Sequence, residues 1–156
     1  MMGHIKISWY HIAIPIVFLL FSPVMLLSFK PHVSPYIVAV PAEYASMMSP
    51  VPPVFARAPY FVIYDFKHNT AKFVVNNFVN AKHEVGLHVA HLLIRERTGI
   101  VLGKNVGPEP FEHLSRRGVK IYTALASNVQ EALSKYNAHQ LMQTAGPTGF
   151  SKVFSK

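Results

Sequence analysis

The chain has 156 residues, of which 51% are hydrophobic and 14% charged, and it carries 15 Lys and Arg against 7 Asp and Glu. This length fits one domain of ordinary size with an additional segment, and the apolar content excludes a wholly disordered chain. Because cysteine is absent, disulfides, thiolate zinc sites, cysteine nucleophiles and iron–sulfur clusters bound by the chain's own thiolates are excluded. The nine histidines are the main soft metal ligands that remain.

The N-terminal part of the chain is apolar, because residues 7–29 contain no Asp, Glu, Lys or Arg. As a helix this segment would measure about 35 Å, more than the hydrocarbon layer of a bilayer. We therefore expect residues 1–30 to form an uncleaved, single-span membrane anchor; a cleaved signal peptide and a buried core helix are the alternatives. The anchor would place the protein in a bacterial inner membrane or an organelle membrane. Lys6 and Lys30 slightly favour a head on the non-cytoplasmic side.

The next segment, residues 31–59, contains seven of the twelve prolines. Proline fixes φ and has no N–H to donate, so it interrupts helices and central strands. The segment therefore predicts a stiff, partly extended linker between the anchor and a folded head.

Short apolar runs separated by turn residues begin at Tyr60 and predict a folded head over residues 60–137. Gly99 is expected to end the first helix and Gly118 the second, while Ser127 or Asn128 caps the third. The strand–helix–strand repeats indicate an α/β fold with a mixed sheet and helices on its faces. Residues 138–156 are expected to form a flexible basic tail. The predicted strands are 60–66, 71–76, 100–103 and 119–122, and the predicted helices are 84–97, 107–117 and 127–136.

Three histidines are candidate metal ligands. His83 comes directly before the first predicted helix, where backbone N–H groups could hold an anionic ligand and the imidazole could bind iron. Glu84, His88 and His91 are spaced so that they share one stripe of that helix, which could meet a divalent metal ion. The alternatives are an unliganded polar residue at a helix start and a solvated helix face.

A second candidate is the turn between the predicted strand 100–103 and the helix after it. It contains Gly103, Lys104, Asn105 and Gly107, and it follows the carboxyl end of a strand, where open α/β sheets usually bind ligands. Lys104 and Asn105 could contact an anionic ligand there. The alternative is a purely structural turn that needs glycine at two points. The turn lacks the Gly-Lys-Ser/Thr ending of a P-loop.

Two stretches of the head resemble a known family. The turn Asn105-Val106-Gly107-Pro108 and the strand Gly118-Val119-Lys120-Ile121-Tyr122 are similar to motifs of the dinitrogenase iron-molybdenum cofactor biosynthesis domain. The resemblance covers residues 60–137. It implies a ribonuclease-H-like α/β fold, binding of iron, iron–sulfur or iron–molybdenum clusters, and a cofactor-binding role for His83 and for the turn. Pro110 stands where the family usually has alanine.

Together these features predict a membrane-tethered protein that binds or carries a metal or metal cluster. The alternative is a non-catalytic scaffold of the same fold that has lost its cofactor. No Ser/His/acid motif is present, so we do not expect an enzyme. We expect a membrane or metal-handling protein as partner and anionic lipid headgroups as a contact of the tail. Nucleic acid is not expected, because no helix combines basic and aromatic residues.

Overall fold

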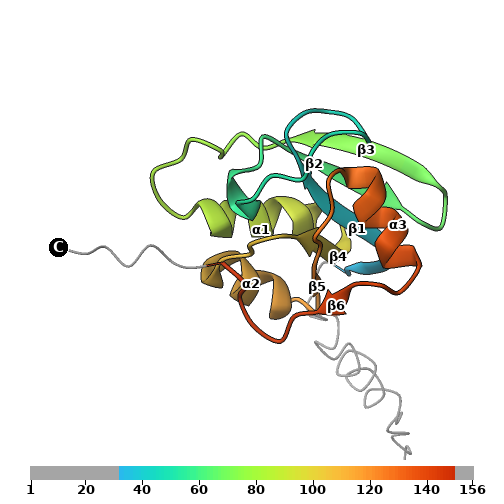
Figure 1. Ribbon diagram of the computed structural model, residues 1–156. Helices are drawn as coiled ribbons and strands as arrows, with labels where there is room; N and C mark the ends of the chain where they lie inside the picture. Colours follow the sequence, from blue (N-terminus) through green and yellow to red (C-terminus); the bar gives the residue numbers. More distant parts are fainter. Residues whose placement is uncertain (1–31, 150–156) are drawn as a thin grey trace, which may run out of the picture. The chain divides into compact units, whose positions relative to one another are not determined.

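The computed structural model describes residues 32–149, which form a mixed sheet of six strands with flanking helices (Figure 1). The strand order is β3-β2-β1-β4-β5-β6. The central strands β1, β4 and β5 are parallel. β2 pairs antiparallel with β1, β3 with β2, and β6 with β5. The bounds are β1 (Ser34–Ala42), β2 (Tyr60–Asp65), β3 (Thr70–Val75), β4 (Thr98–Gly103), β5 (Lys120–Thr123) and β6 (Met142–Gln143).

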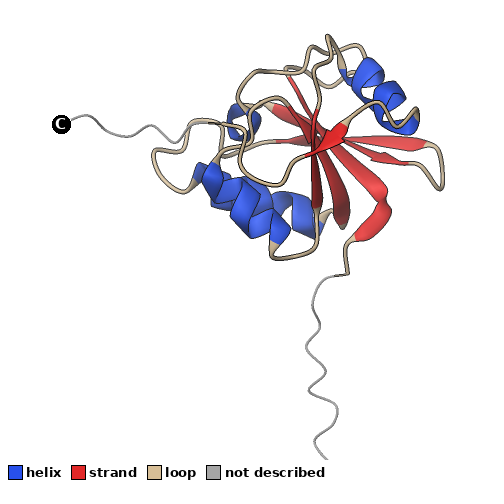
Figure 2. Cartoon of the chain, turned by 60° about the horizontal axis from the view of Figure 1, so that its bottom comes forward, coloured by secondary structure: helices blue, strands red, loops and turns tan. Residues whose placement is uncertain are grey.

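Helices lie on both faces of the sheet (Figure 2). α1 (Val85–Arg95) and α2 (Pro108–Ser115) pack on one face, together with the short 3-10 helix η2 (Phe55–Arg57), and α3 (Val129–Asn137) packs on the other. The apolar core is therefore divided into two layers by the sheet. Burying one apolar stripe of each helix against the sheet is what stabilises this arrangement.

The predicted order of elements from Tyr60 onward is confirmed: a strand hairpin, then three helices that alternate with two strands. Two predictions about the ends of helices, which rested on single residues, are also confirmed. Gly118 adopts φ 79° directly after α2, the left-handed conformation that glycine adopts easily at a helix end. Asn128 caps α3, since its side-chain oxygen accepts a 2.8 Å hydrogen bond from the N–H of Glu131.

The predicted role of Gly99 is wrong. α1 ends at Arg95, and Arg97 with φ 60° makes the turn into β4. Gly99 instead lies inside β4, where an added Cβ would be 2.1 Å from the carbonyl oxygen of Ser34 in β1. This glycine is therefore needed for the close approach of two strands rather than for ending a helix.

The predicted linker over residues 31–59 is also wrong, because it contains the central strand β1. Val38, Ala39 and Val40 are completely buried between the two helical layers, and β1 pairs with β2 on one side and β4 on the other. Pro35 falls in an irregular stretch of the β1–β4 pairing, between the paired residues Ser34 and Val38. Its missing N–H therefore interrupts no regular ladder.

The C-terminal tail predicted over 138–156 is ordered in its described part. β6 extends the sheet beside β5. Further on, the backbone N–H groups of Thr148 and Gly149 donate to the carbonyl oxygen of Val106 at 2.9 and 3.0 Å. Residues 150–156 lie outside the described residues.

Within residues 32–149 no helix is long and apolar enough to cross a bilayer. The predicted anchor at residues 7–29 lies outside the described residues.

Candidate functional site

The loops that carry the predicted site residues gather at one edge of the sheet. β1, β4 and β5 are parallel, and β3 has the same direction because it is antiparallel to β2, which is antiparallel to β1. These four strands end at the same edge, which we call the carboxyl edge. The loops after them are residues 43–59, 76–84, 104–107 and 124–128. The His83 loop and the Gly103–Gly107 turn therefore lie at the same end of the sheet.

The loop before α1 is fixed by two side chains. Asn76 is buried; its side-chain amide donates to the carbonyl oxygens of Ala56 and Ala58 at 3.1 and 2.8 Å, and its Oδ1 accepts from the N–H of Phe78 at 3.0 Å. Nη1 of Arg57 donates to the carbonyl oxygens of Val79 and Ala81 at 2.7 and 2.8 Å. The loop that carries His83 is thus held in place before any ligand binds.

The start of α1 has open donors and an unusual backbone. Its N-cap, Glu84, adopts φ 53° and ψ 27° and makes no side-chain capping bond. The first N–H groups of a helix have no partner within the helix, so they remain available to an anion at this end. A left-handed conformation in a residue other than glycine stores strain of about 1–2 kcal/mol. His83, two residues before the helix, is exposed at the same end.

The turn after β4 is packed on both sides. Asn105 donates from its side-chain Nδ2 to the carbonyl oxygen of Pro53 at 2.8 Å, and its own carbonyl accepts from the N–H of Phe55 at 3.2 Å. On the other side, the hydroxyl of Thr148 accepts from the N–H of Val106 at 3.0 Å and donates to the carbonyl of Lys104 at 3.2 Å. Asn105 therefore has a structural role here, while the side chain of Lys104 has no hydrogen-bond or ion-pair partner among the described residues.

The two glycines of this turn differ in their surroundings. An added Cβ at Gly103 would lie 3.1 Å from the ring of Phe55 and 3.2 Å from Val106, so a side chain at this position would require one of these two side chains to shift by a few tenths of an ångström. Gly107 has open space around it apart from Pro110 at 3.9 Å. Its backbone nitrogen is covered, however, because an added Cβ at Gly149 would lie only 3.2 Å from it.

The start of α2 offers few N–H donors. Its first and third residues, Pro108 and Pro110, have none, which leaves Glu109 as the only N–H donor among the first three, with a carboxylate beside it. The predicted contribution of backbone N–H groups to anion binding is therefore weak at this helix; α1 has no proline in its first turn, but the carboxylate of Glu109 also lies close to its second residue, Gly86.

The starts of the two helices lie side by side. An added Cβ at Gly86 would be 2.4 Å from Cδ of Pro110 and 2.6 Å from a carboxylate oxygen of Glu109. Glycine at position 86 allows this approach. The His83 loop and the Gly103–Gly107 turn therefore lead into neighbouring helix starts on one face of the sheet.

The histidines of α1 do not form the predicted set of ligands. His88 stacks on Phe78, with ring centroids 4.5 Å apart and an interplanar angle of 10°. His91 instead faces His113 of α2, with centroids 6.2 Å apart. Within residues 32–149 no three His, Asp or Glu side chains are placed to hold one metal ion. His113 could not be identified from the sequence, because its contact with His91 depends on how α1 and α2 pack.

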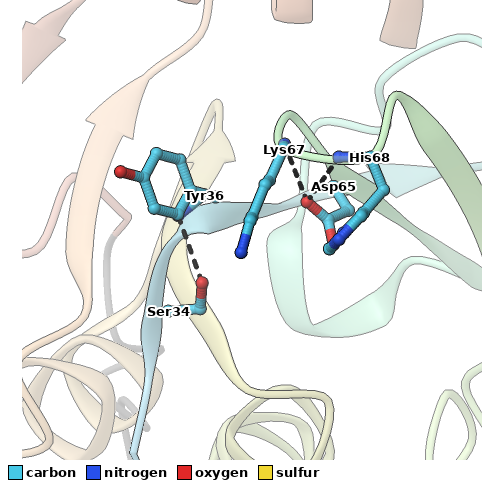
Figure 3. A network of polar contacts seen from close by, with 5 residues as sticks. All are labelled: Ser34, Tyr36, Asp65, Lys67 and His68. Atoms are coloured by element: carbon cyan, nitrogen blue, oxygen red, sulfur yellow. Dashed lines mark hydrogen bonds and ion pairs between the residues drawn. The ribbon is translucent and has the colours of Figure 1, made fainter.

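The opposite edge of the sheet, which we call the amino edge, carries most of the free positive charge. The five exposed cations there make no ion pair within the described residues. Figure 3 shows the β2–β3 turn of this edge beside the start of β1. The carboxylate of Asp65 accepts from Nδ1 of His68 at 2.7 Å and from the N–H of Lys67 at 2.8 Å, which lowers the pKa of that carboxyl. The cations of the amino edge are Lys67, Arg95, Arg97, Arg117 and Lys120.

A cavity of about 380 Å³ lies on the other face of the sheet, between α3 and β2. Tyr64, Phe66 and Leu133 contribute to its lining. None of the predicted site residues reaches it, so it is separate from the carboxyl-edge loops beside α1 and α2.

Comparison with known proteins gives two kinds of match. The family profile described as "Dinitrogenase iron-molybdenum cofactor" covers residues 36–139. Among solved structures, the apo form of the orange protein from Desulfovibrio gigas is similar, with 30% identity and a TM-score of 0.71 over 74% of this chain and 98% of that one. A Thermotoga protein described as NifB-like is 32% identical with a TM-score of 0.65, over 76% and 98%. No curated protein sequence matches the chain.

Proposed function

Because the chain belongs to the dinitrogenase iron-molybdenum cofactor family, we propose that it binds and carries an iron-containing metal cluster, of the iron–sulfur or iron–molybdenum type, at the carboxyl edge. The family match and the likeness to the orange protein support a metal-cluster role. The strand order, with an antiparallel β2 beside a parallel centre, supports the ribonuclease-H-like form of this fold.

The observation that carries the proposal is the start of α1. The loop before this helix is held in place by Asn76 and Arg57. After it come the exposed His83, the strained Glu84 and the uncapped N–H groups of the helix. A preformed cluster that carries anionic ligands is an anion, so N–H donors at a helix start can hold it by hydrogen bonds and one imidazole can ligate a metal of it. Lys104 is at the neighbouring helix start and would complete the contact.

These ligands and hydrogen-bond donors are better suited to a cluster that is bound temporarily and passed on than to a permanently bound cofactor. The chain has no cysteine, and the described residues hold no three-ligand metal group. The protein would therefore hold a preformed cluster by one ligand and by hydrogen bonds, which leaves the cluster's other positions free for transfer to a recipient protein. We assign it no catalytic step.

The test uses the full-length protein in detergent, under anaerobic conditions, titrated with isolated iron–molybdenum cofactor and, separately, with a preformed iron–sulfur cluster. The absorbance of protein-bound cluster after gel filtration is the measurement. His83→Ala and Lys104→Ala should weaken binding. His139→Asn is the control, because His139 is exposed and adopts φ 56°, a conformation that asparagine tolerates. No binding by the wild type, or equal binding by His83→Ala, would leave the scaffold alternative.

We also propose that residues 7–29 tether the protein to a membrane. The first paired residue of β1, Ser34, lies beside Thr98 at the amino edge. The N-terminal end of the domain is therefore at the same edge as Arg97, Lys120 and the other cations of the amino edge. Each cation near an anionic leaflet contributes about 1 kcal/mol to membrane attraction. Because anionic lipids are enriched in the cytoplasmic leaflet, these cations favour the cytoplasmic side, opposite to the side that Lys6 and Lys30 alone favour.

Two measurements test the tether. Alkaline carbonate should leave the full chain in the membrane fraction, and its release would contradict a spanning segment. The side is tested with Ser115→Cys, a single cysteine at an exposed position of α2 in a chain without others. A membrane-impermeant maleimide should label this cysteine only after the membrane has been permeabilised, so that the reagent can reach the cytoplasmic side. Labelling of intact cells would place the domain on the other side.

A further inference from the structure

A pair of histidines lies on the outer surface of the two helices that cover one face of the sheet. The ring of His91 in α1 and the ring of His113 in α2 have centroids 6.2 Å apart and are inclined by 70°. His91 is exposed and His113 is half-buried. Within the described residues neither ring makes a hydrogen bond or an ion pair, so the ring nitrogens are free to bind another group.

The packing of the helices holds this pair together. α1 and α2 run in the same direction, from the carboxyl edge toward the amino edge, and they come close at Gly86 and Pro110. His91 is five residues beyond Gly86 and His113 is three residues beyond Pro110. With a rise of about 1.5 Å per residue, both histidines are roughly one turn along from this contact. The pair is thus a product of rigid helix packing, since no flexible loop contributes to it.

The spacing suits a shared metal ion. Imidazole is a preferred ligand of Zn²⁺, Cu²⁺ and Ni²⁺. A Zn–N distance of about 2.0–2.1 Å places each ring centroid about 3.2 Å from the ion, so two rings at a tetrahedral angle have centroids about 5.2 Å apart. The observed distance of 6.2 Å is about 1 Å longer, a difference that a rotation of the exposed His91 side chain can close. Two protein ligands leave the remaining coordination positions to water or to another protein.

We propose that His91 and His113 are the two protein ligands of a site that binds a single divalent transition-metal ion, either Zn²⁺ or Cu²⁺. The site is distinct from the proposed cluster site. His91 is six residues, about 9 Å along the helix axis, beyond Val85, the first residue of α1, whereas His83 lies in the loop before the helix. The proposal therefore does not depend on cluster binding.

The experiment is a calorimetric titration of the full-length protein, with any affinity tag removed, against ZnCl₂ and CuCl₂, with MgCl₂ as the metal control. Each of His91→Ala and His113→Ala should weaken binding by about tenfold or more, because even the loss of a group that only supports a ligand can cost that much. His139→Asn should bind like the wild type. Circular dichroism of each variant shows that it is folded.

A second readout follows from the geometry. An ion that joins α1 to α2 binds only the folded chain, so zinc should raise the melting temperature of the wild type and not that of either single variant. Wild-type affinity in both variants would overturn the proposal, and so would the loss of zinc binding in His83→Ala alone. Loss in only one of the two variants would show a single-histidine site and would also overturn it.

Discussion

Gly86 of α1 and Pro110 of α2 are in such close contact that a Cβ at position 86 would lie 2.4 Å from Cδ of Pro110. This contact brings together the helix starts of the candidate cluster site and aligns the helices that carry the two-histidine pair. A helix interior usually gains stability when glycine is replaced by alanine, by about 1 kcal/mol. At this position the neighbouring helix would have to move instead.

We therefore predict that Gly86→Ala lowers the free energy of unfolding by about 1–3 kcal/mol, the usual effect of overpacking. Urea unfolding followed by circular dichroism measures it. Gly146→Ala is the control, because nothing lies within 4 Å of a Cβ at that position, and it should change the stability by less than about 0.5 kcal/mol. A Gly86→Ala variant as stable as the wild type would show that α1 and α2 can separate at no cost.

The buried amide of Asn76 gives a second prediction. Asn76→Ala should cost about 2–4 kcal/mol, because three hydrogen bonds are lost and buried backbone groups remain without partners. Asn76→Asp should be at least as damaging, since a carboxylate cannot donate to the carbonyl oxygens of Ala56 and Ala58. Asn77→Ala, at the exposed neighbouring position, is the matched control. If Asn76→Asp were tolerated, the donor role of this side chain would be wrong.

The central place of β1 predicts how fragments behave. A fragment of residues 32–156 should fold and unfold cooperatively in urea. A fragment of residues 57–156 lacks the strand that separates β2 from β4, and with it the completely buried Val38, Ala39 and Val40. It should show no cooperative unfolding and no dispersed NMR spectrum. A folded 57–156 fragment would mean that β2 can pair directly with β4.

Glu131 predicts a dependence of stability on acid pH. Its carboxylate accepts from Nζ of Lys135 at 2.7 Å and from the N–H of Ser127 at 2.8 Å, which lowers its pKa from 4.5 to about 2. A pKa that is lower in the folded state stabilises the fold above pH 4.5, and this contribution is lost as the pH falls from about 4.5 to about 2.

The measurement is the melting temperature of the wild type and of Glu131→Gln between pH 2 and pH 7. The wild type should be the more stable protein at neutral pH, and the difference should disappear near pH 2. Because the carboxylate is at the surface, added salt should reduce the difference. A difference that stays constant with pH would exclude titration of Glu131 as its cause.

The sequence predicted most of the domain, and its errors have physical reasons. From Tyr60 to Asn137, periodicity and turn residues identified each strand and helix, because each element has one apolar stripe or run, whereas the two-residue strand β6 was missed. β1 was missed because the prolines at 35 and 41 suggested a linker, whereas the proline-free stretch between them is long enough to pair on both sides. Gly99 was misassigned because a glycine that ends a helix and one that lets two strands approach look alike in sequence.

For the candidate site, the sequence placed the loops but not the partners of the side chains. Topology alone brings His83 and the Gly103–Gly107 turn to one edge, and that was predictable from the order of elements. The contact of His91 with His113, the stacking of His88 on Phe78, and the bond of Asn105 to Pro53 all join separate elements. Helical spacing describes one helix at a time, so it could not find them.

The pairing of β1 with β4 has a consequence for the order of events during synthesis. Ser34 leaves the ribosome about sixty residues before Thr98, its partner in the sheet. β2 and β3 follow β1 closely in the chain, so a three-stranded antiparallel unit can form first, while the backbone edge of β1 that pairs with β4 remains unpaired. Closing the long loop to β4 is the slow step of such a topology. A nascent chain stalled before β4 should therefore depend on chaperones, and release of that dependence should coincide with the emergence of β4.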